Sequence, residues 1–458
     1  MMKHYFTTKG LLLAAVIISL SACDKNDDRP DEKPVGYLYT SINGEGENRV
    51  VRFSRSNNGG LSNEKSWGTG GNGGANVAAG GDAHGDFDAQ GSVQIIGDWL
   101  LAVNAGSNQV AVFSLDRKSG DLGFKSNTVS GGTRPVSIAF TKKGNNNNSE
   151  YWVVVANQWN NPNVQKDGAK IERYPSNAFF MADLSKPDAT DAERNIRLFS
   201  FNSVTGTLSP EKLLDTYNRE NGGPTTVSFS DDGKKIAVST WGIAHFDTQV
   251  TSVTEQHPSR VYIYDFVSGN ISGRRYFEEK GIAGSIGFSW ARNSSSKLYV
   301  SNFNLIPEKI DNSVTVLEDN SSTVIKKSNY GVTAGSAINE ACWTALSPDG
   351  NNLYVASFQT NLVSAFSVNG ASLSLKSVDQ RKDVAPNGDS KELWVSPDGK
   401  FVYNLGAFQS FSINLFTASG NNIKYKSQTI LGTTASGLGT AGKYNFLGLT
   451  GYDLPDKK

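Results

Sequence analysis

The chain has 458 residues, which is enough to bury a large core in a single domain. Its 44 Lys and Arg residues balance 44 Asp and Glu residues, and this zero formal charge excludes a broad electrostatic attraction to nucleic acid. Its 47 Gly residues indicate many turns, and short apolar runs between Gly, Asn, Asp and Pro dominate from Gly36 onward, without long amphipathic helical patterns. We therefore expect an all-β protein.

Residues 1–22 predict a signal peptide. A basic start precedes the apolar run Leu11 to Leu20, which is too short for a permanent membrane-spanning helix. The sequence Leu-Ser-Ala before Cys23 resembles the lipobox of bacterial lipoproteins, which implies that Cys23 becomes the lipidated first residue of the mature chain. The alternatives are an ordinary cleaved signal or a short anchor.

Residues 23–35 predict a flexible tether, because they are charged and interrupted by prolines. The acidic cluster directly after Cys23 also resembles the surface-export signal of lipoproteins in some Gram-negative bacteria, whereas elsewhere an aspartate at that point favours retention at the inner membrane. We expect a lipid-anchored protein of the cell envelope at the outer membrane, facing the periplasm or the cell surface. The sequence is compatible with an anchor in either leaflet of the membrane.

Residues 36–458 carry seven copies of one pattern, in which a short alternating strand is followed by a second one and then by a Gly- or Asn-containing turn typical of β-hairpins. The copies lie about 50 to 80 residues apart, as in repeated β architectures such as propellers. The central strands are predicted at Tyr37–Ser41, Leu101–Ala105, Val153–Asn157, Ile236–Thr240, Leu298–Asn302, Leu353–Ser357 and Phe401–Leu405.

An inner strand is predicted before every central strand except the first. These inner strands are Ser92–Ile96, Val136–Phe140, Thr225–Phe229, Gly284–Phe288, Trp343–Leu346 and Leu393–Val395. The C-terminal run 445–450 reads as a strand but has no repeat after it. We therefore expect this run to complete the first blade of a seven-bladed β-propeller, which leaves no open sheet edge between the first and last repeats.

The repeats resemble the lactonase-type seven-bladed β-propellers, the family of bacterial 6-phosphogluconolactonase and carboxymuconate cyclase. The resemblance lies in the Ser-Pro-Asp-Gly turns at Ser347–Gly350 and Ser396–Gly399, the related turn Ser230–Gly233, and the strands LYVSN and LYVAS. It covers nearly all of residues 36–454 and implies a central channel lined by the inner strands.

The resemblance also implies a histidine that faces this channel after a Gly-Pro-Arg approach to the inner strand. Ser137, Thr226, Trp343 and Glu392 occupy that position in four repeats of this sequence, and no inner-strand repeat keeps the histidine. A hydroxyl group does not act as a general base near neutral pH as imidazole does. We therefore do not expect this chain to use the histidine-dependent catalysis that the resemblance implies.

His84 is the best catalytic candidate among the histidines, because it precedes the second inner strand in the Gly- and Asp-rich run 80–88. Such a cluster can bind a metal or pair an imidazole with an acid, and the alternative is a solvated loop. Glu340 precedes the sixth inner strand and Glu392 enters the seventh, so an enzyme of this fold would use His84 with Glu340 or Glu392 as acid and base.

The ligand-binding candidates are Arg134, Arg381, Trp343 and Thr226, which lie at or near the entries of inner strands. Arginines at the channel mouth can hold a carboxylate or phosphate in bidentate fashion, so the pocket would accept an acidic or hydroxylated ligand. Alternatively, these charges solvate loop ends or pair with each other.

The remaining features add little chemistry. Cys342 lies in an apolar run and reads as a small core residue rather than a nucleophile. The aromatic-rich insertion from Asn160 to Asn195 either packs onto the propeller or contacts a ligand. No phosphate-binding loop, nucleotide fingerprint, metal-ligand spacing or nucleophile elbow is found, so neither a cofactor nor a metal is expected.

The sequence thus supports two hypotheses. The first is a monomeric, envelope-anchored β-propeller lipoprotein whose loops bind a small acidic or sugar-like ligand, or an envelope protein, without turnover. The alternative is a lactonase-like hydrolase or cycloisomerase that acts on a sugar or muconate-type lactone.

Overall fold

The computed structural model describes residues 33–44, 47–74, 89–144, 149–158, 194–218, 221–242, 258–305, 313–333, 339–382, 388–407, 410–431 and 446–455. The predicted signal peptide, Cys23 and His84 lie outside these residues, as does nearly all of the predicted insertion. In the described ranges, no helix is long and apolar enough to cross a membrane.

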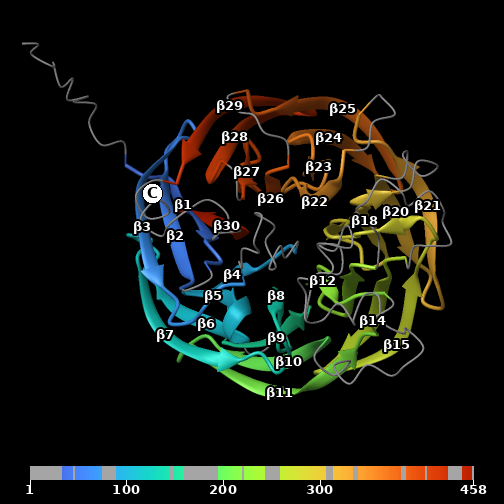
Figure 1. Ribbon diagram of the computed structural model, residues 1–458, viewed down its shortest axis with the longest axis horizontal. Helices are drawn as coiled ribbons and strands as arrows, with labels where there is room; N and C mark the ends of the chain where they lie inside the picture. The colour runs from blue at the N-terminus through green and yellow to red at the C-terminus, as the bar shows by residue number, and fades with distance from the viewer. Residues whose placement is uncertain are drawn as a thin grey trace, which may run out of the picture. The chain divides into compact units, whose positions relative to one another are not determined.

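Within residues 34–458, the described strands form seven four-stranded antiparallel sheets, the blades, which are arranged around a common centre (Figure 1). The innermost strands of blades 1 to 7 are, in order, β30 (Leu447–Asp453), β4 (Val93–Ile96), β8 (Pro135–Lys142), β12 (Pro224–Phe229), β17 (Phe288–Trp290), β22 (Ala341–Leu346) and β26 (Ser390–Val395). The second strands are β1 (Gly36–Ser41), β5 (Trp99–Asn104), β9 (Glu150–Asn157), β13 (Lys235–Thr240), β18 (Lys297–Ser301), β23 (Asn352–Ser357) and β27 (Phe401–Gly406).

The third and fourth strands complete each blade toward the outside of the ring. The third strands are β2 (Arg49–Arg55), β6 (Gln109–Leu115), β10 (Asn195–Asn202), β14 (Val261–Val267), β20 (Val314–Asp319), β24 (Leu362–Asn369) and β28 (Ser412–Ser419). The outermost strands are β3 (Leu61–Gly68), β7 (Leu122–Val129), β11 (Thr207–Thr216), β15 (Asn270–Phe277), β21 (Val324–Tyr330), β25 (Ser372–Gln380) and β29 (Asn422–Ile430). A short 3-10 helix (Ala105–Ser107) links β5 to β6.

The C-terminal strand closes the ring, as predicted. β30 pairs antiparallel with β1 from Gly36 opposite Asp453 to Ser41 opposite Leu447, so one blade contains both ends of the propeller sequence. This pairing leaves no unpaired edge on β1, which would otherwise be open to another chain.

The hydrophobic core lies between neighbouring blades. Leu38 and Phe53 of blade 1, for example, pack in one cluster with Tyr403 and Leu415 of blade 7. The second strands β1, β23 and β27 are buried along their whole length, whereas in the outermost β25 only Leu373 is buried. The apolar runs seen in the sequence therefore correspond to strands that are covered on both faces.

The predicted Ser-Pro-Asp-Gly turns connect innermost and second strands. Ser347 accepts the Asn352 amide through its hydroxyl at 2.9 Å and donates to Asp349, and Gly350 has a φ of +74°. Only glycine adopts that conformation without strain, which explains the last position of the turn. We call the end of the ring that carries these turns the hairpin face, and the opposite end, where Arg134, Glu340 and Arg381 lie, the loop face.

Blade 5 departs from the prediction. The run Gly284–Phe288 was expected to be one inner strand, but β16 (Ile282–Ala283) pairs with β19 (Asn304–Leu305), and β17 begins only at Phe288. Gly284 has a φ of +69°, which interrupts an extended strand. At Gly287, a Cβ atom would lie 2.5 Å from Oε1 of Gln90, so another segment occupies the space of a side chain.

Candidate functional site

The segment Ala89–Gly91, just before β4, crosses the centre of the ring. The Gln90 amide donates to Oγ1 of Thr226 in blade 4 at 3.1 Å, and its side-chain Nε2 donates to the carbonyl of Phe288 in blade 5 at 3.1 Å. Its Oε1 accepts from the Thr344 amide in blade 6 at 3.2 Å. Together with contacts to blades 3 and 7, this segment ties together the innermost strands of five blades.

The four positions that the family resemblance equates with a channel histidine all contact this segment. Ser137 donates through its hydroxyl to the Gln90 carbonyl at 2.6 Å, and Trp343 donates through Nε1 to the Ala89 carbonyl at 2.9 Å. Thr226 accepts from the Gln90 amide, and Glu392 accepts from the Gly91 amide at 2.8 Å. Sequence alone placed these residues near the channel but did not reveal Gln90, which is their common partner.

A repeated irregularity in the strands explains why these side chains meet. In blades 3, 4, 6 and 7, the pairing of the innermost strand with its second strand shifts just before or at these positions, between Pro135 and Ser137, Pro224 and Thr226, Ala341 and Trp343, and Ser390 and Leu393. Such bulges redirect a side chain out of the regular alternation. These four blades therefore each direct one hydrogen-bonding side chain at the same central segment.

Gly91 is required by the backbone path. Its φ is +85°, and a Cβ atom there would lie 3.0 Å from Nε2 of Gln94. A residue with a side chain is strained in that conformation. The turn at Gly91 delivers the chain from the centre of the ring into β4.

Glu392 is a buried carboxyl group with only 6% of its surface exposed. Its Oε2 atom has no hydrogen-bond partner among the described residues. Burial raises the pKa of Glu392 to about 8, although the backbone amides of Gly91 and Gly448 act in the opposite direction. Burial therefore favours the protonated, neutral form of this side chain near neutral pH, which is the form that a general acid requires.

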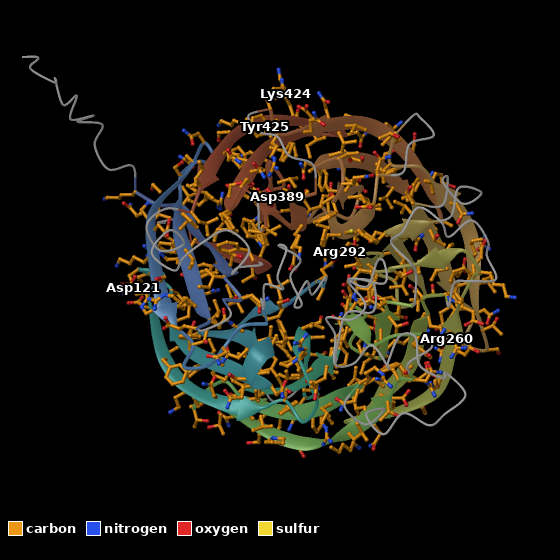
Figure 2. All side chains as sticks on the ribbon, in the orientation of Figure 1. Asp121, Arg260, Arg292, Asp389, Lys424 and Tyr425 are labelled. Atoms are coloured by element: carbon orange, nitrogen blue, oxygen red, sulfur yellow. The ribbon has the colours of Figure 1, made fainter. Side chains whose placement is uncertain are left out.

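Arg381 is engaged in a buried ion pair. Its guanidinium group binds the Asp389 carboxylate and donates to Oγ of Ser410 at 2.8 Å, and both charged side chains are almost completely buried. Figure 2 shows Asp389 on the inner side of the ring, whereas Lys424 lies at the outer rim. This geometry matches the alternative of paired charges more closely than a ligand contact.

Arg134 and Glu340 lie at the entries of blades 3 and 6, and both are partly exposed on the loop face. Both have a positive φ, +59° for Arg134 and +54° for Glu340. Their carbonyls accept backbone amides from Gln158 and Phe358, which fixes the loop path. Both lie at the rim, whereas Trp343 is completely buried and packs in the core.

Cys342 is buried in the core between blades, as expected for a small apolar residue. Among the described residues, no group of three or more His, Cys, Asp or Glu side chains could hold a metal ion. The His84 loop lies outside them and stays a prediction.

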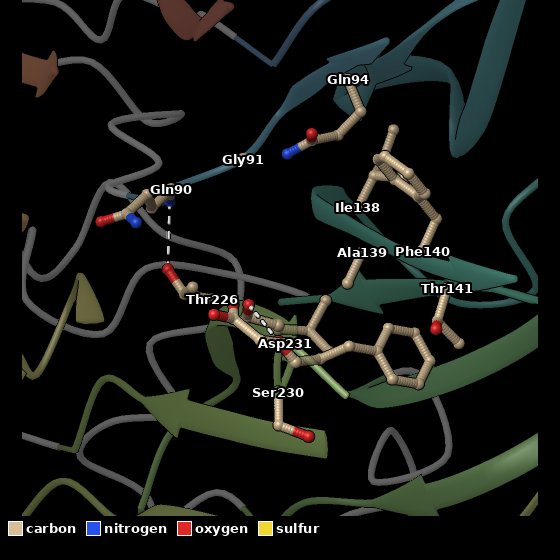
Figure 3. A pocket seen from close by; sticks show the side chains of 13 residues that line it. Gln90, Gly91, Gln94, Ile138, Ala139, Phe140, Thr141, Thr226, Ser230 and Asp231 are labelled. Atoms are coloured by element: carbon tan, nitrogen blue, oxygen red, sulfur yellow. Dashed lines mark hydrogen bonds between the residues drawn. The ribbon is translucent and has the colours of Figure 1, made fainter. Parts of the chain in front are cut away.

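Two cavities lie beside Gln90 on its hairpin-face side, with volumes of about 290 Å³ and 520 Å³. The smaller cavity is lined by blades 2, 3 and 4, and the larger one by blades 1, 2, 5, 6 and 7. Gln90 and Gln94 line both. Figure 3 shows the hydrogen bond between Gln90 and Thr226 at one side of the smaller cavity and Gln94 across from Thr226.

Seven blades closed by a C-terminal strand define the chain as a seven-bladed β-propeller. No family model and no curated protein matches it. Solved structures with the same fold include the periplasmic gluconolactonase of Pseudomonas aeruginosa (14% identity, TM-score 0.57, 90% of this chain and 99% of that chain).

A candidate 6-phosphogluconolactonase from Bacteroides fragilis is also similar (14% identity, TM-score 0.54, 92% of this chain and 99% of that chain). So is a protein from Lactobacillus plantarum (12% identity, TM-score 0.57, 91% of this chain and 98% of that chain). The predicted resemblance to lactonase-type propellers is thus confirmed at the level of the fold.

Proposed function

We propose that this protein is an envelope-anchored β-propeller lipoprotein that binds a ligand or an envelope protein through its loop face, without turnover. One observation carries the proposal. The positions equated with a catalytic histidine hold Ser137, Thr226, Trp343 and Glu392, and all four are used to fix the chain's own segment Ala89–Gly91. Ser137, Thr226 and Trp343, whose polar groups are committed in this way, are not free to activate water.

The anchor rests on the signal sequence. A lipid on Cys23 and the charged tether 24–35 would hold the propeller close to a membrane while leaving its loops accessible. The outer membrane is the proposed location, and the periplasmic gluconolactonase among the structural neighbours is compatible with an envelope setting.

The binding surface proposed on the loop face includes the partly exposed Arg134 and Glu340. A screen of the full-chain protein against sugar acids, sugars and envelope extracts tests this proposal. We expect binding that Arg134→Ala weakens by about tenfold, the loss of one charged hydrogen bond, while Lys424→Ala at the outer rim leaves it unchanged. Lactone hydrolysis without any binding in this screen would contradict the proposal.

A second candidate, lactonase-like hydrolysis, is favoured by Glu392. A carboxyl group that stays protonated near neutral pH can protonate a leaving group, and two structural neighbours are described as lactonases. The test is hydrolysis of glucono-1,5-lactone, 6-phosphogluconolactone and muconolactone. This candidate requires turnover that both His84→Ala and Glu392→Gln abolish, and it is excluded if turnover is absent or survives both changes.

A further inference from the structure

The two cavities beside Gln90 are separate in position from the proposed loop-face site. Their lining reaches the ends of the innermost strands, including Asp231 and Pro348, which belong to the turns of the hairpin face. Gln90 forms their common floor, because its amide and side chain are fixed by hydrogen bonds to blades 4, 5 and 6. A ligand from this side would therefore stop at the centre of the ring.

The lining offers hydrogen-bonding groups that the protein itself does not use. Gln94 lines both cavities, and its side-chain amide makes no hydrogen bond within the described part of the chain. The side-chain hydroxyl of Thr450, in the larger cavity, likewise makes none there. Ser289 and Thr344 share one hydrogen bond between their hydroxyls at 2.8 Å, which leaves one further proton to donate. An amide and several hydroxyls both donate and accept, as a ligand rich in hydroxyl groups requires.

The charge of the lining offers no strong attraction to anions. Among the described lining residues, Arg292 is the charged one in the larger cavity and Asp231 the charged one in the smaller cavity, and Nη1 of Arg292 lies 3.5 Å from Oδ1 of Asp231. A phosphate or carboxylate group would find no unpaired cation on these walls. A neutral ligand meets no such penalty.

Shape and aromatic content complete the description. The larger cavity, at about 520 Å³, is within the range of small-molecule sites. Trp394 forms part of its wall. Its ring packs against Tyr403 and lies beneath the Arg55 guanidinium group, and the part that remains exposed offers apolar surface to a sugar ring. We propose that this cavity binds a neutral, polyhydroxylated small molecule of the sugar class, bound by Gln94, Thr450 and Trp394.

The experiment is calorimetric titration of the full-chain protein with glucose, galactose, N-acetylglucosamine, maltose and cellobiose, and in parallel with glucose 6-phosphate and gluconate. We expect at least one neutral sugar to bind and its anionic counterparts to bind more weakly. Gln94→Leu and Thr450→Val are each expected to weaken binding about three- to tenfold, the cost of one neutral hydrogen bond. Gln380→Leu on the exposed outermost strand β25 is the matched control and leaves binding unchanged.

The outcome is decisive in both directions. Absence of binding by every neutral sugar, tighter binding of the anions, or full affinity in a folded Gln94→Leu variant overturns the proposal. Equal melting temperatures of variants and parent show that the fold is intact, and Trp394→Leu gives an independent test of the same wall. Arg134→Ala separates this site from the loop face, because it leaves sugar binding here unchanged even if loop-face binding fails.

Discussion

The titration of Glu392 at the buried centre of the propeller makes the stability of the fold depend on pH. Its carboxyl group holds the Gly91 amide and has a pKa near 8, well above the ordinary value for glutamate. At pH values between the ordinary pKa and the pKa in the folded chain, Glu392 is protonated when the chain is folded and ionised when it is unfolded. The contribution to stability is complete below the ordinary pKa and disappears as the pH rises through about 8.

We therefore expect the free energy of unfolding to fall with rising pH by up to about 1.4 kcal/mol per pH unit in this window. Glu392→Gln removes the titrating group, so this decrease should be flattened, and the variant should gain stability relative to the parent as the pH rises. Urea unfolding between pH 5 and 9 measures both. Glu211→Gln, on exposed β11, is the control, and an unchanged slope in Glu392→Gln would refute the assignment.

Gln90 is the second residue whose loss should be felt widely. Gln90→Ala leaves the Thr344 amide and the Phe288 carbonyl without partners at the centre of the ring. Unsatisfied buried groups of this kind cost about 1 to 3 kcal/mol each, so we expect a loss of about 2 to 4 kcal/mol in thermal or urea unfolding. Gln380→Ala on the surface should cost less than about 0.5 kcal/mol, and a similar small cost for Gln90→Ala would show that the segment does not brace the blades.

Neighbouring blades are also joined by buried charges, as blades 4 and 5 show. Asp319 on β20 accepts from Nε and Nη2 of Arg275 on β15 at 2.5 and 2.6 Å and from Lys235 at 2.5 Å. Burial alone would raise the pKa of Asp319, but the hydrogen bonds from Arg275 and Lys235 hold it below its ordinary value. The carboxylate is therefore ionised in the folded chain.

Asp319→Ala is expected to destabilise the protein by about 3 kcal/mol, because it leaves buried cations without their main partner. Asp265→Ala removes a more exposed partner of the same Arg275 and should cost less than about 1 kcal/mol. Urea unfolding of the two variants gives the comparison. Equal costs would mean that burial does not decide the strength of this blade contact.

The closing strand can be tested at the same scale. Leu449 of β30 is buried in the core shared by blades 1 and 7, so Leu449→Ala should cost about 2 to 4 kcal/mol. Removal of residues 446–458 should abolish cooperative unfolding, as followed by circular dichroism, and cause aggregation through the exposed edge of β1. Removal of 456–458 alone is the control, and a stable monomer without β30 would contradict the closure.

At the scale of the whole molecule, the proposed anchor predicts a change of location. Cys23→Ser removes the only thiol that lipidation can use at the signal, so the protein should move from the membrane fraction to the soluble fraction and lose palmitate labelling. The parent protein and a Cys342→Ser variant serve as controls, since Cys342 lies buried in the propeller. Retention of Cys23→Ser in the membrane would point to another anchor.

The sequence predicted the blades well because each blade is local. A second strand such as Leu353–Ser357 shows its burial in its own apolar run, and its turn shows the residues that the backbone demands. The run 445–450 was correctly placed in blade 1 because it was the one strand left over. The split in blade 5 was not predicted. Hydrophobic periodicity reveals neither the positive φ of Gly284 nor the neighbouring segment that packs against Gly287.

The centre of the ring was harder to predict for a physical reason. Gln90 meets Thr226 and Thr344 across more than a hundred residues of sequence, and nothing in Ala-Gln-Gly marks that meeting. Position within the repeats did predict that Thr226, Trp343 and Glu392 would lie near the centre. It could not predict that they would be used to hold a segment of the chain itself.

The pairing of β30 with β1 also governs how the protein is made. The first blade must wait with three strands until the last residues leave the ribosome and, if the signal acts as predicted, pass through the inner membrane. Until β30 is made, the nascent chain therefore carries an unpaired edge on β1 that can pair with another chain. A chaperone that shields strand edges during this interval would determine how much of the chain closes into a propeller.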